Sequence, residues 1–169
     1  MSQIEIFVFS FVKDYDGTPL EYTNEDCFVF APDGITVEYE LKGTITEPGS
    51  VDGEISNVVV KDANGNDVTD LYYIDVIKGS LTIDKVNIEV TANSVEKKYD
   101  GTPLTSDECW ISFGSLIEGH SLVTEVVGKI VDIGTEKNKI SSVKVIDENG
   151  NDVTKYYEIK KVDGVLTII

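Results

Sequence analysis

Residues 60–83 read VKDANGNDVTDLYYIDVIKGSLTI, and residues 145–168 repeat the pattern as VIDENGNDVTKYYEIKKVDGVLTI. An upstream motif is duplicated in the same order, because KDYDGTPL at residues 13–20 returns as KKYDGTPL at residues 97–104. The copies lie about 85 residues apart. Solenoid and propeller repeats are shorter, roughly 20–50 residues, since each needs a neighbour to bury a core. A longer unit can bury its own core, so the duplication predicts two tandem domains, Met1–Asp84 and Lys85–Ile169.

The junction between the two domains is expected to be stiff. Residues 80–90 read SLTIDKVNIEV, which contains none of the Gly, Pro or Ser runs of a flexible linker. The last strand of the first domain is therefore predicted to run almost directly into the first strand of the second.

Apolar residues recur with the period of β-strands in both copies. Val37, Tyr39 and Leu41 alternate with charged residues, as a half-buried strand requires, and residues 122–127 follow more loosely. Further strands are predicted at residues 4–12 and 88–95, 27–30 and 109–113, 55–60 and 140–146, 72–77 and 156–162, and 81–83 and 166–168. No segment has a clear helical period, so the chain is predicted to be all-β.

Turn signals separate these strands. The DGTP and NGND motifs each supply a glycine for a positive-φ position. Short strands between regularly spaced turns predict a small immunoglobulin-like β-sandwich in each domain. The alternative is a β-grasp-like domain with one short helix, at residues 21–27 or 106–116. Those segments contain CFVF and WISF, which favour strand over helix.

The composition excludes several classes of partner. The net charge is −17, and all 14 basic residues are lysines. Phosphate backbones and anionic membranes repel such a surface, so nucleic acid is not an expected partner. No apolar run approaches the roughly 20 residues of a membrane span, and no secretion signal begins the chain. Membrane insertion within this segment is not expected, and a signal or anchor would lie outside it.

The cysteines are predicted to be free thiols. Cys27 and Cys109 occupy equivalent places in the two copies. A disulfide framework would need pairs within one domain, and equivalent positions of successive domains are too far apart to bridge. Each cysteine is expected to be a small buried apolar residue.

The repeated string, K-x-YDGTPL followed by NGNDVT and G-x-LTI, resembles the YDG/MBG-type repeat modules of large bacterial cell-surface proteins, adhesins among them. The resemblance covers nearly the whole chain in both copies. The first copy departs at residues 4–11, where IEIFVFSF replaces IEVTANSV. The resemblance implies extracellular display on a bacterium and a non-catalytic stalk or spacer role in a longer monomeric chain. It implies no cofactor and no catalytic residue.

The alternative function is an adhesive module that recognises host glycan or mucin, and a host protein is a further conceivable partner. The half-apolar rings of aromatic residues can stack on sugars. Trp110 is the leading candidate for a glycan contact. One tyrosine of each pair, Tyr72 with Tyr73 and Tyr156 with Tyr157, is expected to be core. In immunoglobulin-like folds a tyrosine near such a corner hydrogen-bonds back to the backbone, and Thr69 or Thr154 is expected to help fix that turn.

Calcium is the sharpest metal hypothesis, because two loops cluster the oxygen ligands that hard cations prefer. The candidate ligands are Asp62, Asn64, Asp67, Asp147, Asn149 and Asp152. An EF-hand loop requires glycine at its sixth position and glutamate at its twelfth. The glycine here comes too early and Tyr73 stands where glutamate is needed. The alternative is an acidic turn whose aspartates cap backbone amides.

Covalent chemistry has few candidates. A lysine–asparagine cross-link could use Lys13 or Lys98, whereas the single glutamine, Gln3, nearly excludes a thioester. His120 is the only histidine, so a Ser-His-Asp arrangement would need it. A histidine beside a turn glycine is expected to be a solvated loop residue, and the chain is predicted not to be an enzyme.

Overall fold

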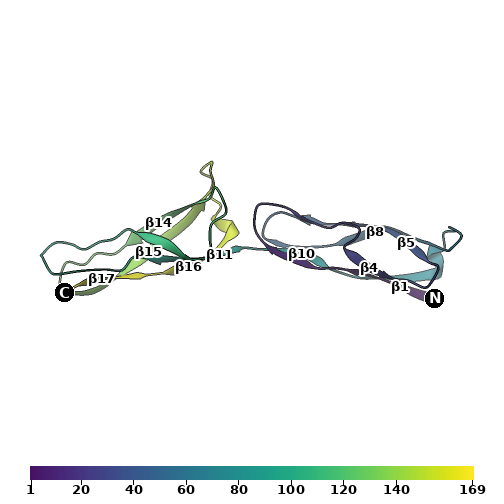
Figure 1. Cartoon of the computed structure of the whole chain (residues 1–169), viewed down its shortest axis with the longest axis horizontal. Helices are drawn as coiled ribbons and strands as arrows, with labels where there is room; N and C mark the ends of the chain where they lie inside the picture. Colours follow the sequence, from purple (N-terminus) through teal and green to yellow (C-terminus); the bar gives the residue numbers. More distant parts are fainter. The chain divides into compact units, whose positions relative to one another are not determined.

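The computed structural model describes residues 1–169 and divides the chain into two compact units, Met1–Asp84 and Lys85–Ile169 (Figure 1). Nearly all regular structure is strand, which confirms the all-β class. The only helices are two 3₁₀ turns, η1 (Thr69–Leu71) and η2 (Thr154–Tyr156). Neither has the length or the apolar character to cross a bilayer.

The first unit is built from short strands in four small sheets. Their orders are β4-β1-β9, β2-β10-β7, β3-β6 and β5-β8. The strands are β1 (Ser2–Val8), β2 (Phe11–Asp14), β3 (Leu20–Glu21), β4 (Cys27–Phe30), β5 (Thr36–Lys42), β6 (Thr44–Ile45), β7 (Gly49–Asp52), β8 (Glu54–Lys61), β9 (Tyr72–Ile77) and β10 (Ser80–Asp84).

The second unit repeats this plan with fewer interruptions. Its sheets have the orders β13-β11-β16 and β12-β17-β15-β14. The strands are β11 (Val86–Ala92), β12 (Val95–Lys97), β13 (Cys109–Phe113), β14 (Ser121–Val127), β15 (Gly134–Ile146), β16 (Tyr157–Val162) and β17 (Gly164–Ile168). The single long strand β15 corresponds to β7 and β8 of the first unit.

The first two strands of each unit run parallel to its last two strands. In the first unit Ser2 lies opposite Tyr72 at the start of β9, and Asp14 lies opposite Asp84 at the end of β10. The second unit has the same arrangement, with β11 parallel to β16 and β12 parallel to β17. The chain therefore begins each unit at one end and leaves it at the other, as the positions of β1 and β10 in Figure 1 show.

The predicted strands at residues 4–12 and 88–95 are each broken in two, so their predicted lengths were wrong. The chain changes sheet at the break, because β1 pairs with β9 whereas β2 pairs with β10. Ser10 stabilises the break by accepting a hydrogen bond from the Ser80 amide at 3.1 Å. Gly79 packs against it so closely that a Cβ there would overlap the carbonyl oxygens of Val8 and Phe9.

Each core lies between facing sheets, as in a sandwich. In the first unit Val8, Leu41 and Leu81 come from three different sheets and pack in one cluster with Tyr22. The core of the second unit joins side chains of β11, β15 and β16 and consists of Ile88, Val90, Ala92, Ile140, Val145, Val153 and Tyr157. Burying a side chain of this size stabilises a fold by about 1.5–3 kcal/mol.

The structure does not contain the helix that a β-grasp-like domain would require. Residues 21–27 form the end of β3, a turn and the start of β4, while residues 106–116 contain β13. The aromatic and β-branched residues of these segments pair in sheets, as their strand propensity favours.

The two units satisfy the same buried carbonyl with different side chains. In the first unit the Tyr22 hydroxyl donates to the Phe9 carbonyl at 2.6 Å. At the corresponding place in the second unit, the side-chain amide of Asn138 donates to the Asn93 carbonyl at 2.9 Å. Asn138 is fully buried, and the glycine at its place in the first unit, Gly53, leaves room for the Tyr22 ring.

Both cysteines are free, as predicted, but neither is fully buried. The Cys109 thiol lies 3.0 Å from the Thr124 hydroxyl, and the Cys27 thiol lies 3.7 Å from the Asn24 carbonyl. Hydrogen bonding with Cys27, together with burial, raises the pKa of Tyr39 to about 12. Both cysteine side chains pack against the hydrophobic cores of their units, so the expected apolar role is confirmed, whereas the expected burial is only partial.

Candidate functional site

The YDGTPL motif forms the same locked loop in both units. In the first unit the Lys13 ammonium donates to the Asp16 carboxylate at 2.8 Å and to the Thr18 carbonyl at 2.8 Å. Asp16 also accepts hydrogen bonds from the Thr18 amide and hydroxyl, at 2.9 and 2.6 Å. The ammonium thus ties the beginning of the loop to its end, and every carboxylate contact of Asp16 lies within the motif.

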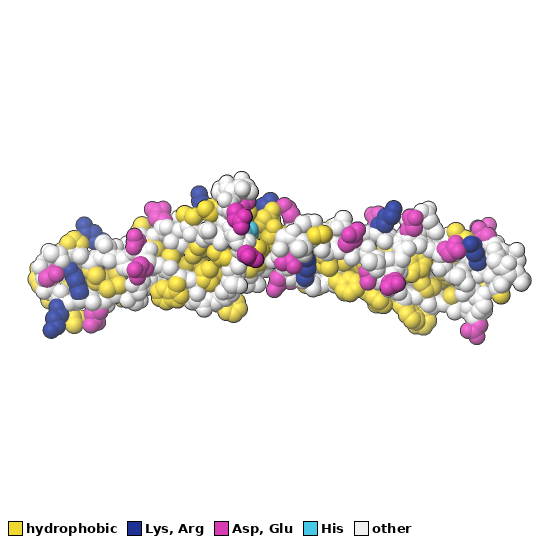
Figure 2. Space-filling view, turned by 45° about the horizontal axis from the view of Figure 1, so that its top comes forward, with side chains coloured by type: hydrophobic (Ala, Val, Ile, Leu, Met, Phe, Trp, Pro, Cys, Tyr) yellow, Lys and Arg dark blue, Asp and Glu magenta, His cyan; other side chains and the backbone are white.

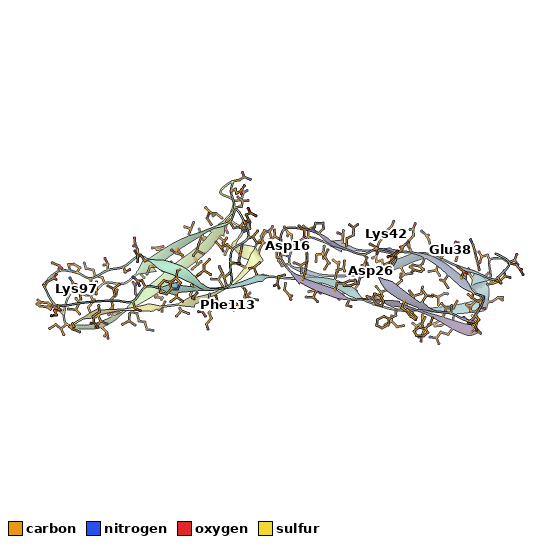
Figure 3. All side chains as sticks on the ribbon, in the orientation of Figure 1. Asp16, Asp26, Glu38, Lys42, Lys97 and Phe113 are labelled. Carbon is orange, nitrogen blue, oxygen red and sulfur yellow. The ribbon has the colours of Figure 1, made fainter.

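The corresponding loop of the second unit has the same partners at the same distances. Lys97 donates to Asp100 at 2.8 Å and to the Thr102 carbonyl at 2.8 Å. The hydrogen bonds from lysine and threonine hold the pKa of Asp16 and of Asp100 well below the usual range of an aspartate. Asp16 and Lys97 are labelled in Figure 3. These loops are structural clasps in which the same pattern of charge is repeated.

The predicted cross-link candidates have other contacts. Lys13 bonds within its own loop, and Lys98 is exposed beside the structural lysine Lys97. The structure brings neither lysine into a hydrogen bond with an asparagine. The lysine–asparagine cross-link stays an untested hypothesis, which intact-mass measurement would test through the loss of one ammonia for each bond.

The NGNDVT loops use their first aspartate as a turn cap. The Asp62 carboxylate accepts from the backbone amides of Asn64 and Asn66, at 2.9 and 3.0 Å, and from the Asn66 side chain at 3.0 Å. Asp147 makes the same contacts with Asn149 and Asn151. These hydrogen bonds, that of the asparagine side chain foremost, lower the pKa of both aspartates.

The second aspartate of each NGNDVT loop caps the following 3₁₀ turn. Asp67 accepts from the Thr69 amide and hydroxyl at 3.0 and 2.6 Å, and Asp152 does the same for Thr154. The Thr69 hydroxyl in turn accepts from the Val60 amide at 2.9 Å, which confirms that threonine fixes this turn.

The calcium candidates are therefore engaged by donors of their own loops. No group of three His, Cys, Asp or Glu side chains gathers to hold a metal ion. The acidic-turn interpretation accounts for each contact of Asp62, Asp67, Asp147 and Asp152 described above, while Asn64 and Asn149 contribute backbone amides. Calcium binding stays an untested hypothesis beside the acidic turn that the sequence favours, and calorimetry would test it.

His120 belongs to a packed corner of the second unit. Its Nδ1 atom lies 2.6 Å from the Tyr157 hydroxyl, which also accepts a hydrogen bond from the Ile117 amide at 3.0 Å. Burial raises the pKa of the Tyr157 hydroxyl. The expectation that His120 is a solvated loop residue was wrong, because the ring is half-buried against the only fully packed tyrosine of its unit.

The tyrosine pairs divide between core and surface. Tyr157 is buried, while Tyr73 in the first unit is exposed and its neighbour Tyr72 is half-buried. One residue of each pair therefore faces inward, although Tyr72 is less enclosed than Tyr157. The Tyr157 hydroxyl contacts the Ile117 backbone, which is the kind of contact that the sequence predicts for a corner tyrosine.

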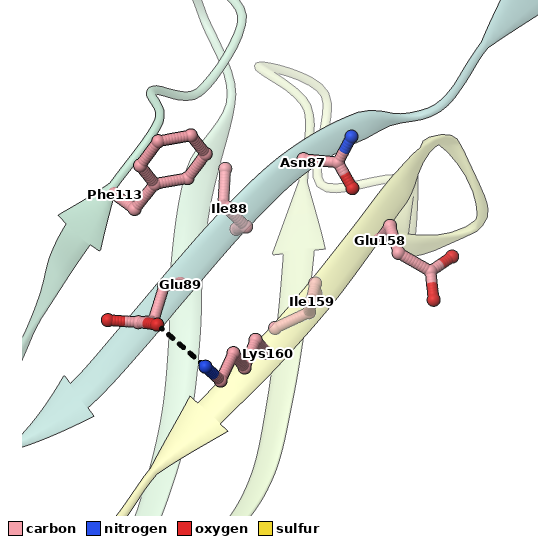
Figure 4. A pocket seen from close by; sticks show the side chains of 7 residues that line it. All are labelled: Asn87, Ile88, Glu89, Phe113, Glu158, Ile159 and Lys160. Atoms are coloured by element: carbon pink, nitrogen blue, oxygen red, sulfur yellow. Dashed lines mark ion pairs between the residues drawn. The ribbon is translucent and has the colours of Figure 1, made fainter.

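Trp110 is 49% exposed, on the outer face of the β13-β11-β16 sheet opposite Thr91. A hollow near Trp110 on the same sheet does not include it. That hollow has a volume of about 500 Å³ and is lined by Asn87, Ile88, Glu89, Phe113, Glu158, Ile159 and Lys160 (Figure 4). Phe113 was not singled out from the sequence, although the WISF strand carries it two residues beyond Ile111.

The hollow combines one aromatic wall with charged rims. Phe113 is 65% exposed. Glu89 and Lys160 form an ion pair of 3.4 Å across the neighbouring strands β11 and β16, drawn as a dashed line in Figure 4. Hydrogen bonding with Ser112, and further with Lys160, lowers the pKa of Glu89. The arrangement can bind a ligand with an apolar side and polar edges, and it contains no nucleophile with an oriented base.

Comparisons with known proteins return no match: no protein-family model, no curated protein and no solved structure resembles the chain significantly.

Proposed function

We propose that this chain is a non-catalytic, tandem-repeat segment of a bacterial cell-surface protein, in which successive units act as spacers that carry an adhesive part away from the cell. The observation that carries the proposal is the parallel pairing of the first two strands of each unit with its last two strands. This pairing separates the beginning and end of a unit by its full length, so each added unit would lengthen the protein.

The length of one unit follows from strand geometry. With a rise of about 3.3 Å per residue, the path from Ser2 at the start of β1 to Asp14 at the end of β2 covers roughly 40 Å. Only Lys85 separates β10 from β11, so the chain has no slack between the two units. The acidic surface, with a net charge of −17, supports the same role because like charges keep neighbouring molecules apart.

Small-angle X-ray scattering on the whole chain tests the spacer. Two units in line would give a radius of gyration of about 24 Å from their strand lengths, whereas a compact globule of this size would give about 15 Å. A tandem chain of four units should add roughly 80 Å to the maximum dimension. A radius near the compact value, or no lengthening with added units, would contradict the proposal. Protease shaving of intact cells that produce the parent protein tests surface display.

A glycan-binding module is the second candidate function, and the hollow beside Phe113 and the exposed Trp110 favour it. A sugar ring could stack on the Phe113 face while Asn87, Glu89 and Lys160 meet its hydroxyls. A glycan array with the intact chain tests this function. Reproducible binding that Trp110→Ala or Phe113→Ala removes, and that the Val123→Ala control retains, would favour the glycan-binding module over a pure spacer.

A further inference from the structure

The two units differ on one surface in a way that bears on binding, the outer face of the sheet β4-β1-β9 and its counterpart β13-β11-β16. Alternate residues of β1 point inward, so that Ile4, Ile6 and Val8 are buried. The remaining residues of the strand face outward, where Phe7 replaces the Thr91 of the second unit. The change of polarity between residues 4–11 (IEIFVFSF) and residues 88–95 (IEVTANSV) at Phe7 therefore lies on the surface. The inward-facing residues of the strand are apolar in both copies.

The register of the strands arranges the outer face of the first unit in rows across the sheet. One row is apolar and contains Phe28, Phe7 and Ile77. The next row contains Phe30, Glu5 and Asp75, and a third pairs Gln3 with Tyr73. The corresponding rows of the second unit contain Trp110, Thr91 and Val162, then Phe113, Glu89 and Lys160, then Asn87 and Glu158. The phenylalanine row and the acidic row are thus specific to the first unit.

The phenylalanine rings are exposed although they contact one another. Phe7, Phe28 and Phe30 are 46%, 51% and 61% exposed. Phe28 and Phe30 pack edge to face with ring centroids 4.7 Å apart, and Phe9 extends the cluster from the end of β1, 6.2 Å from Phe7. Figure 2 shows hydrophobic side chains projecting along the lower border of the right-hand, N-terminal unit.

The exposed rings form one contiguous apolar patch. A phenylalanine buries about 150–250 Å² when fully covered, so these four half-exposed rings leave roughly 400 Å² in water. The largest apolar patch of a soluble monomer is commonly about 300–600 Å² and is often functional. The area is smaller than one side of a stable protein–protein interface, about 800 Å², which indicates a short and weakly held partner segment.

The charges beside the rings define that partner. Glu5 lies directly opposite Asp75, and like charges in this position repel each other. Only Gln3 lies between them, donating to Glu5 at 3.4 Å and to Asp75 at 3.3 Å. Neither carboxylate forms an ion pair. In the second unit Lys160 occupies the place of Asp75 and pairs with Glu89 at 3.4 Å. The first unit lacks this cation and leaves room for one from outside.

We propose that the outer face of β4-β1-β9 docks an extended polypeptide segment in which basic and apolar side chains alternate on one side. Successive outward positions of a strand are about 6.6 Å apart, so a partner with the same spacing places a cation over Glu5 and Asp75 and an apolar side chain over Phe7 and Phe28. A guanidinium there also meets the faces of the phenylalanine rings. A second copy of this chain is a poor occupant, because it would bring acid against acid.

A peptide titration of the whole, isotopically labelled chain tests the docking face. The probe is acetyl-GRTFTRTFTG-amide, whose arginines and phenylalanines lie on one side when it is extended. Two matched controls replace its arginines by glutamate or its phenylalanines by serine. We expect the probe to shift amide resonances of β1, β4 and β9 with a dissociation constant below about 1 mM, and each control to bind at least tenfold more weakly.

Two substitutions replace a residue of the first unit by the residue at the equivalent position of the second unit. Phe7→Thr and Asp75→Lys should each weaken probe binding at least about tenfold, or 1.4 kcal/mol, without lowering the melting temperature, while Val123→Thr in the second unit should change nothing. Equal binding of the glutamate control, absence of any binding, or shifts outside these strands would overturn the proposal. If the chain instead self-associates as its concentration rises, and Phe7→Thr abolishes this association, the occupant of the face is a second copy of the chain and the peptide-docking proposal is overturned.

Discussion

Gly164→Ala should destabilise the second unit alone. Gly164 opens β17 beside the break between β11 and β12, and a Cβ there would overlap the carbonyl oxygen of Asn93 and lie 2.7 Å from that of Ala92. Both obstacles are backbone atoms, so the two chain segments must separate. Overpacking of this kind costs about 1–3 kcal/mol and sometimes more, and backbone contacts place the change near the upper limit.

The expected shift is large enough to resolve by calorimetry. For a domain of 60–100 residues, about 3 kcal/mol corresponds to a fall of roughly 12–24 °C in melting temperature. Differential scanning calorimetry of the whole chain should show one transition moving with Gly164→Ala and the other moving with Gly79→Ala, the equivalent change in the first unit. Val165→Thr, an exposed neighbour, should shift neither by more than a few degrees. A shift below about 4 °C for Gly164→Ala would refute the close-packing argument, and simultaneous movement of both transitions would refute independent units.

Three further measurements test local interactions. Tyr22→Phe removes the hydroxyl that donates to the Phe9 carbonyl and should lower the free energy of unfolding of the first unit by about 1–3 kcal/mol. Asn138→Ala should lower that of the second unit by at least as much, and chemical denaturation measures both. A variant as stable as the wild type would contradict the role given to that side chain. Because Lys97 holds the pKa of Asp100 below its ordinary value of 3.8 in the folded unit, this clasp stabilises the fold above about pH 4 and fades as the pH falls toward the folded-state pKa. The difference in melting temperature between wild type and Asp100→Asn should therefore be largest at neutral pH and shrink below pH 3.8, and a difference that grows with acid would contradict the assignment. Since the loop donors already engage Asp62 and Asp147, calorimetric titration with calcium should give no heat and no rise in melting temperature, and a saturable heat would restore the calcium hypothesis.

Local patterns in the sequence predicted the parts of the fold that depend on near neighbours. Period-two alternation located the strands, and the hydroxyl of Thr69 fixes its turn as expected. The parallel pairing of β1 with β9 joins residues about 70 positions apart, and no local period encodes such a pairing. The strand break at Phe9 was missed for the same reason, because the change of sheet depends on distant Gly79.

The surface sites were harder to predict because exposure depends on the opposite sheet. In IEIFVFSF both alternating faces are apolar, which is the pattern of a strand buried on two sides. The structure covers only the face of Ile4 and Ile6 and leaves Phe7 in water. His120 shows the converse, since a turn histidine next to glycine lies against Tyr157, a residue 37 positions away.

The parallel alignment of the first two strands with the last two also determines how a unit responds to tension. A pull applied at both ends of the first unit drags β2 and β10 past each other along their lengths. Because the ladder hydrogen bonds run across the strands, they bear such a load together and do not open one at a time. The same pairing thus forms a mechanical shear clamp within the unit, a property that the proposed spacer role would use.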